Sequence, residues 1–246
     1  MLCDMGRMVW FDFGDTVLEF YRWDAAAGLA AVLQHILGES PDARLQEKAL
    51  ERSRLLNQLF ETRSSATGLE YDQRSFLRLL CEPLTGRMAD SLPEQLAGIY
   101  WDTAFSFRAQ PGIHEALDWL DDAGISCGII SNASFPARQL AMELARHGLG
   151  DRFDPIISTA DYGLRKPEAE LFYLAEKLQP AGSTLPPWYF GNSIPLDIRG
   201  ALAAGWHAGW YNRGGESRQR CPAAARELHS WGDLPRILQD TRQEAR

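Results

Sequence analysis

From Gln110 onward, the chain alternates short apolar runs with amphipathic segments, and this alternation limits the possible folds more than any other feature of the sequence. The apolar runs of strand length cover 125–130, 155–158, 188–190 and 207–211. Apolar strands separated by helices predict a parallel sheet that helices cover on both faces. Met8–Phe11 predicts a further buried strand, which must pair with strands that come much later in the chain.

Between that first strand and the alternating region, helical periodicity dominates. Breaks at 38–41, 66–68 and 83–87 separate the helical segments. No strand is expected from about Trp23 to Phe107. The sequence therefore predicts an α/β protein with a Rossmann-like parallel sheet core, made of residues 1–20 and 108–246. Residues 21–107 are expected to form an inserted helical cap domain.

Charge and composition argue against several classes of function. The net charge of −8 argues against a nucleic-acid surface, because phosphate backbones are bound by clustered cations. No apolar stretch approaches the roughly 18 residues that a membrane span needs, and the N-terminal residues do not resemble a secretory signal. The cysteines form no CxxC pair, and Cys81 and Cys127 are expected to be buried. We expect a cytoplasmic protein that binds a small molecule, of unknown oligomeric state.

Polar side chains follow each predicted strand at the point where it ends. Asp12 follows the first strand and Ser131-Asn132 the second, Lys166 lies shortly beyond the third, and Asp197 lies beyond the fourth. The carboxyl ends of parallel strands meet at one edge of a sheet, where such folds bind ligands. Each residue alone is typical of an ordinary turn or helix cap. Together they favour a carboxylate nucleophile, a hydroxyl and an ammonium that hold an anionic group, and an acidic cluster for a divalent cation.

Four segments resemble the four motifs of the haloacid dehalogenase-like (HAD) hydrolase superfamily. They are FDFGDTVL, IISNAS, DYGLRKPEAELF and YFGNSIPLDIRGALAAGW, and they span essentially the whole chain. The helical insert resembles the C1 cap of that superfamily. The resemblance implies that Asp12 is the nucleophile, which attacks phosphorus or carbon. It also implies catalytic roles for Ser131 and Lys166, and that Thr16 steadies the nucleophile loop.

The resemblance further implies Mg²⁺ as the cofactor. The expected ligands are the Asp12 carboxylate, the Gly14 carbonyl and the Asn192 amide oxygen, with Asp197 binding directly or through water. Oxygen atoms of this kind are the ligands that Mg²⁺ prefers.

The substrate is expected to lie against residues close to these motifs. Asn132 and Thr16 are predicted to bind it, and so is Arg22, which lies just after the nucleophile loop where the cap begins. Lys48, the only lysine of the cap, is expected to lie on a surface helix face rather than to form a Schiff base.

Two positions depart from the motifs of the family's phosphatases. Gly14 stands where those enzymes usually carry a second aspartate, which acts as general acid and base. Asn192 stands where the fourth motif commonly begins with aspartate. Asp15 is adjacent to the first gap, but neighbouring residues point in different directions. The two departures predict weakened phosphatase activity.

Three functions are compatible with these residues. The leading hypothesis is a Mg²⁺-assisted phosphatase of small phosphorylated metabolites, acting through an aspartyl-phosphate on Asp12. A second is a dehalogenase-type hydrolase, in which Asp12 attacks carbon and expels halide. A third is a non-catalytic or regulatory protein that retains the fold.

Overall fold

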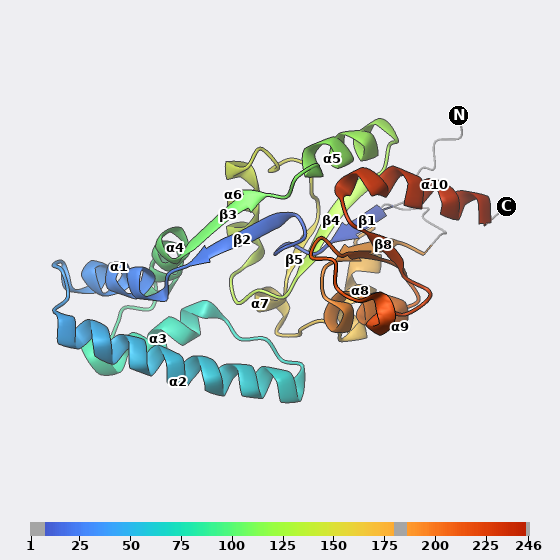
Figure 1. The fold of residues 1–246 in the computed structure, drawn as a ribbon. Coiled ribbons are helices and arrows are strands. Elements are labelled where there is room, and N and C mark those ends of the chain that lie inside the picture. The colour runs from blue at the N-terminus through green and yellow to red at the C-terminus, as the bar shows by residue number, and fades with distance from the viewer. Residues whose placement is uncertain (1–7, 180–185, 245–246) are drawn as a thin grey trace.

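The computed structural model describes residues 8–179 and 186–244, and its centre is a six-stranded parallel sheet (Figure 1). In order across the sheet, the strands are β5 (Ile156–Ser158), β4 (Ser126–Ser131), β1 (Met8–Phe11), β6 (Trp188–Gly191), β7 (His207–Tyr211) and β8 (Arg226–Leu228). The α/β sheet predicted from the sequence is confirmed. The short edge strand β8 was not predicted, because three residues leave no visible period.

Helices cover both faces of this sheet, as the apolar strands require (Figure 1). One face is covered by α5 (Ile113–Asp122), α6 (Ala137–Arg146) and α10 (Leu234–Glu244), and the other by α8 (Ala169–Lys177) and α9 (Arg199–Ala203). Alternate residues of β1 face opposite ways, so that Val9 and Phe11 pack in one cluster and Met8 and Trp10 in the other. The remaining short helices are α7 (Thr159–Tyr162), a π-helical turn (Ile194–Ile198) and two 3₁₀ turns (Arg218–Arg220 and Trp231–Asp233).

The cap consists of α1 (Ala25–Leu37), α2 (Ala43–Thr67), α3 (Gln73–Thr85) and α4 (Leu92–Ala104). Asp24, Asp42 and Asp72 cap the first three helices, since each carboxylate accepts a hydrogen bond from a backbone N–H of the first turn. Gly38 and Gly68 end α1 and α2 in the left-handed conformation. The helical cap and its breaks therefore agree with the sequence prediction.

A two-stranded antiparallel sheet joins cap and core, and its existence corrects the expectation that this region lacks strands. Strand β2 (Leu18–Trp23) leaves the nucleophile loop and pairs with β3 (Phe105–Ala109), which returns from the cap. The proposed domain boundaries at 20/21 and 107/108 fall inside these strands. Helix α4 ends at Ala104, and β3 starts at the next residue. Phe105 and Phe107 lie two residues apart, which is the spacing of side chains on one face of a strand.

The interior meets a further expectation from the sequence. Cys81 and Cys127 are both buried and reduced. Over the described residues, no helix combines the length and the apolar character that crossing a bilayer would require.

Candidate active site

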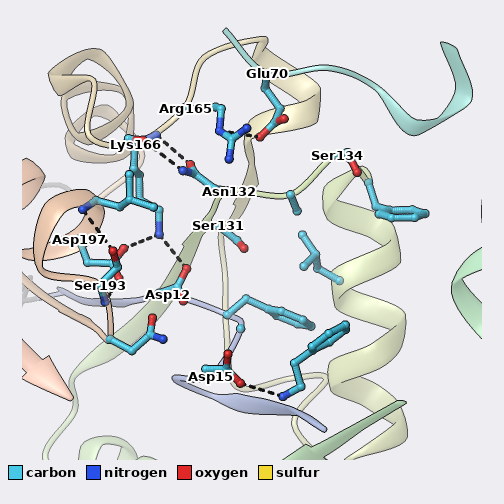
Figure 2. A pocket seen from close by; sticks show the side chains of 18 of the residues that line it. Asp12, Asp15, Glu70, Ser131, Asn132, Ser134, Arg165, Lys166, Ser193 and Asp197 are labelled. Carbon is cyan, nitrogen blue, oxygen red and sulfur yellow. Dashed lines mark hydrogen bonds and ion pairs between the residues drawn. The ribbon is translucent and has the colours of Figure 1, made fainter. Parts of the chain in front are cut away.

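A cavity of about 510 Å³ lies at the carboxyl ends of β1, β4 and β6, with the cap on its other side (Figure 2). Its walls include four residues that the sequence predicted to meet, namely Asp12, Ser131, Lys166 and Asp197. They come from segments spread over most of the chain, and the parallel strands bring them together. The volume lies in the range typical of small-molecule sites.

Asp12 directly follows β1 and is 7% exposed. Its backbone N–H donates to the Phe190 carbonyl, 2.9 Å away, which fixes the end of the strand. One carboxylate oxygen, Oδ1, accepts from Lys166 Nζ at 2.7 Å, and Oδ2 accepts from the Thr16 hydroxyl at 3.2 Å. Burial raises the pKa of Asp12 to about 6, although the ammonium of Lys166 acts in the opposite direction. The carboxylate is thus oriented from two sides.

Lys166 has an acceptor for each of its three ammonium protons. Its Nζ donates to Asp12 Oδ1 and to Asp197 Oδ1, each at 2.7 Å (Figure 2). It also donates to the Tyr189 hydroxyl at 2.7 Å. The side chain is 2% exposed, and the two carboxylates raise its pKa although burial alone would lower it. In this arrangement Lys166 holds the nucleophile. It can bind an anionic group of the substrate only by releasing one of these partners.

The side chains of Ser131 and Asn132, at the end of β4, make different contacts. Ser131 ends the strand, is buried, and points into the cavity beside Asp12 (Figure 2). Asn132 was expected to bind substrate, but its side chain is bonded to the backbone of Lys166. Its Oδ1 accepts from the Lys166 N–H at 2.8 Å, and its Nδ2 donates to the Lys166 carbonyl at 3.1 Å. Asn132 therefore positions the lysine.

The two other predicted substrate-binding residues lie elsewhere. Thr16 is fully buried, and its hydroxyl donates to the Asp12 carboxylate, as expected of a residue that steadies the nucleophile loop. Arg22 does not line the cavity. Its side chain is 64% exposed and forms an ion pair with Asp24 at 2.9 Å. A contact between Arg22 and substrate stays a prediction.

Two of the side-chain oxygens expected to bind Mg²⁺ share a hydrogen-bond donor. The Thr16 hydroxyl donates to Asp12 Oδ2 at 3.2 Å and to Asn192 Oδ1 at 3.5 Å, which places the two acceptors on the same side of the nucleophile loop. Asp197 is committed elsewhere: Lys166 donates to its Oδ1, and the Ser193 N–H donates to its Oδ2 at 2.8 Å. No group of three His, Cys, Asp or Glu side chains in the described chain is spaced to hold a metal. The donors fit a hard cation held by one carboxylate and neutral oxygens, hence weakly.

Gly14 leaves an open space in the site, and Asp15 does not fill it. A Cβ atom at Gly14 would meet nothing within 4 Å. Asp15 has a φ of 56°, the left-handed conformation that favours glycine or asparagine. Its carboxylate accepts from the Phe20 N–H at 3.0 Å and so braces the start of β2 (Figure 2). Asp15 is therefore hydrogen-bonded to strand β2.

Tyr189 is a member of the site that the sequence analysis missed. It lies in the middle of β6, is fully buried, and donates to the Ile130 carbonyl at 2.7 Å while accepting from Lys166. Burial raises the pKa of Tyr189 well above its usual value of 10, so the hydroxyl keeps its proton. A tyrosine in an apolar strand has no local signal that distinguishes it from an ordinary core residue.

Replacing Tyr189 with phenylalanine is expected to lower the free energy of unfolding by about 1–3 kcal/mol, the usual cost of leaving buried polar groups unsatisfied. Lys166 would lose an acceptor and the Ile130 carbonyl a donor. Urea denaturation of wild-type and variant protein measures the difference. Tyr173→Phe is the matched control, because Tyr173 is 48% exposed. Equal losses in both variants would contradict a structural role for the Tyr189 hydroxyl.

The loop between α2 and α3 closes the cap side of the cavity, and the sequence analysis missed this too. The Glu70 carboxylate accepts from the Thr159 hydroxyl at 2.8 Å and lies 3.6 Å from Arg165. Burial raises the pKa of Glu70. The Arg165 N–H donates to the Gly68 carbonyl at 2.8 Å. These contacts attach the cap directly to the segment that carries Lys166.

Comparisons with known proteins agree with this architecture. The family model of haloacid dehalogenase-like hydrolases matches residues 82–210. No curated protein matches the chain. Among solved structures, the 2-haloacid dehalogenase from Pseudomonas syringae pv. Tomato DC3000 is 26% identical with a TM-score of 0.63, and the alignment covers 96% of this chain and 99% of that one.

Two further structures share the fold at lower identity. A HAD phosphatase from Thermococcus onnurineus is 24% identical with a TM-score of 0.58, over 94% of this chain and 97% of that one. The L-2-haloacid dehalogenase from Xanthobacter autotrophicus is 19% identical with a TM-score of 0.57, over 96% and 99%. Phosphatases and dehalogenases thus occur among the structural neighbours, and the likeness does not separate the two reactions.

Proposed function

Because the chain belongs to the haloacid dehalogenase-like hydrolases, we propose that it is a phosphatase of small substrates that acts through an aspartyl-phosphate on Asp12. The observation that carries this proposal is the position of Lys166 Nζ, 2.7 Å from both Asp12 and Asp197. A buried ammonium in contact with Asp12 favours the ionised form of that carboxylate. An ionised, oriented carboxylate beside a cavity is what nucleophilic attack requires.

The reaction divides into two steps. In the first, an Asp12 oxygen bonds to phosphorus, and the bond to the leaving oxygen breaks with its electron pair. In the second, water cleaves the acyl phosphate, which restores the Asp12 carboxylate and releases phosphate. Ser131 lies where its hydroxyl can donate to a phosphoryl oxygen. A bound Mg²⁺, held by Asp12, Asn192 and the Gly14 carbonyl, would offset the charge of the phosphate.

The same geometry limits the range of substrates. Gly14 offers no proton to the leaving group, and Asp15 is hydrogen-bonded to strand β2. The best substrates are therefore expected to be acyl phosphates or esters of acidic alcohols, whose leaving groups depart as anions.

Removal of halide from carbon is the second candidate, and two observations favour it. Halide leaves without a proton, so that Gly14 is no handicap. The Pseudomonas syringae protein, a 2-haloacid dehalogenase, aligns over nearly the whole of both chains at 26% identity. In this alternative Asp12 would attack carbon to form an ester, which water then hydrolyses.

A substrate panel with and without Mg²⁺ tests both candidates. It comprises acyl phosphates, aryl phosphates and 2-haloacids, and it measures the release of phosphate and of halide. Phosphate release that Mg²⁺ stimulates supports the phosphatase. Halide release alone would replace it by the dehalogenase, and release of neither would contradict both.

The metal site gives a separate prediction. Asn192→Asp adds a second full negative charge beside Asp12, and we expect it to tighten Mg²⁺ binding at least about tenfold, or about 1.4 kcal/mol. Titration calorimetry with MgCl₂ on wild-type and variant protein measures the change. Asn212→Asp is the control, because Asn212 does not line the cavity over Asp12. An unchanged affinity for Mg²⁺ in Asn192→Asp would contradict a metal site that includes the side chain of residue 192.

A further inference from the structure

One wall of the cavity is aromatic, and the proposed reaction makes no use of it. The wall comprises Phe13, Phe20, Trp101, Phe105, Phe107 and Phe135. These side chains come from the nucleophile loop, the β2–β3 sheet, helix α4 and the loop after β4. The rings thus surround the same space as Asp12, although they lie far apart in the sequence.

The rings form one continuous cluster that leaves ring surface free toward the cavity. Phe20 lies opposite Phe107 in the register of β2 and β3, with ring centroids 5.4 Å apart. Phe107 stacks on Trp101 at 5.2 Å. Trp101 and Phe13 are buried, whereas Phe20 is 36% exposed and Phe107 is only partly buried. The buried rings form the base of the wall, and Phe20 and Phe107 line the cavity with part of their surface still accessible.

The charged side chains of the cavity can bind only a small part of a ligand. The lining contains five carboxyl side chains and two cations. Both cations are already paired, Lys166 with Asp12 and Asp197, and Arg165 with Glu61 and Glu70. A ligand with several anionic groups would meet net repulsion. One anionic group at Asp12 and an uncharged remainder suit these walls better.

We propose that the substrate carries an aromatic or similarly flat apolar group, which packs on this wall while the reacting atom lies at Asp12. Aromatic rings attract one another in stacked and edge-to-face arrangements, both of which the wall already contains. A cavity of 510 Å³ accommodates one ring and one reacting group. The inference rests on the proposed function only in placing the reacting group at Asp12.

Binding of unreactive probes tests this subsite without turnover. Titration calorimetry compares benzylphosphonate with methylphosphonate, and phenylacetate with acetate. In at least one pair, we expect the ring to tighten binding about tenfold or more, given the area that it buries. Phe20→Ala should reduce that preference at least about threefold, since one face of the wall is lost. Tyr21→Ala is the matched control, because Tyr21 is adjacent, 56% exposed and outside the cavity.

The outcomes separate this inference from the proposed function. Equal binding within both pairs, no binding of any probe, or equal effects of Phe20→Ala and Tyr21→Ala would overturn the aromatic subsite. Should Phe20→Ala not fold, Phe20→Leu keeps an apolar side chain and removes only the ring. A ring preference without release of phosphate or halide in the substrate panel would support the subsite and contradict the reaction. Turnover without a ring preference would do the reverse.

Discussion

Asp12→Asn is expected to lower kcat by at least about 10⁴-fold on whichever substrate the wild-type protein hydrolyses, as removal of a covalent nucleophile generally does. The amide cannot form the intermediate, yet it has the shape of the carboxylate. Its oxygen can still accept from Lys166, whose charge remains paired with Asp197 at 2.7 Å. Steady-state kinetics on the best substrate of the panel measures the loss.

The control for this experiment is the fold of the variant. Circular dichroism and thermal unfolding should show a folded protein, because burying a neutral amide does not carry the desolvation cost that raises the pKa of Asp12. Asp15→Asn serves as the matched variant, since it keeps the acceptor for the Phe20 N–H. Activity of folded, highly purified Asp12→Asn within tenfold of wild type would remove Asp12 from the chemistry.

The central sheet and the meeting of its polar ends could be predicted because the responsible signals are local. β1 and β7 have the predicted bounds, since each is a continuous apolar run that ends in a polar turn. Parallel strands place their carboxyl ends at one edge whatever the details of the loops. The gathering of Asp12, Ser131, Lys166 and Asp197 follows from that topology.

The β2–β3 sheet could not be predicted in the same way, because each of its two strands forms only against a partner that is distant in the sequence. Leu18 pairs with Ala109, and the register shifts between Phe20 and Arg22, which disturbs the alternation of β2. The turn of Arg22 toward Asp24 follows from this strand and not from its position next to the nucleophile loop. The alternation of Phe105 and Phe107 was the one local signal available.

Only some of the contacts of Lys166 could be predicted from the sequence. The sequence predicts that Lys166 lies near Asp12 and Asp197, because their strand ends converge, but it does not predict that the ammonium is bonded to both carboxylates. The hydroxyl of Tyr189 and the amide of Asn132 depend on the path of the Lys166 backbone beside β4, which no pattern specifies. The structure is therefore needed to identify residues whose role depends on hydrogen bonds between distant loops.

The pKa of the leaving group is expected to govern turnover, because Gly14 carries no carboxylic acid that could protonate the leaving group. Positioned proton transfer is typically worth about 10²–10⁴-fold, and acidic leaving groups need it least. Along a series of aryl phosphates, kcat/KM should therefore fall steeply as the pKa of the phenol rises. The slope of log kcat/KM against that pKa is the quantity to measure.

Gly14→Asp should flatten this slope and raise kcat/KM for the least acidic phenol by about 10²-fold, the lower end of the range for a positioned acid. The new side chain has room, since a Cβ at this position meets nothing within 4 Å. Asp15→Asn should leave the slope of the wild-type protein unchanged, because its carboxylate is bonded to the Phe20 N–H. A flat wild-type series that becomes steep in Asp15→Asn would show that Asp15 supplies the proton after all. A Gly14→Asp protein that folds and keeps the wild-type slope would show that the space beside Asp12 does not face the leaving group.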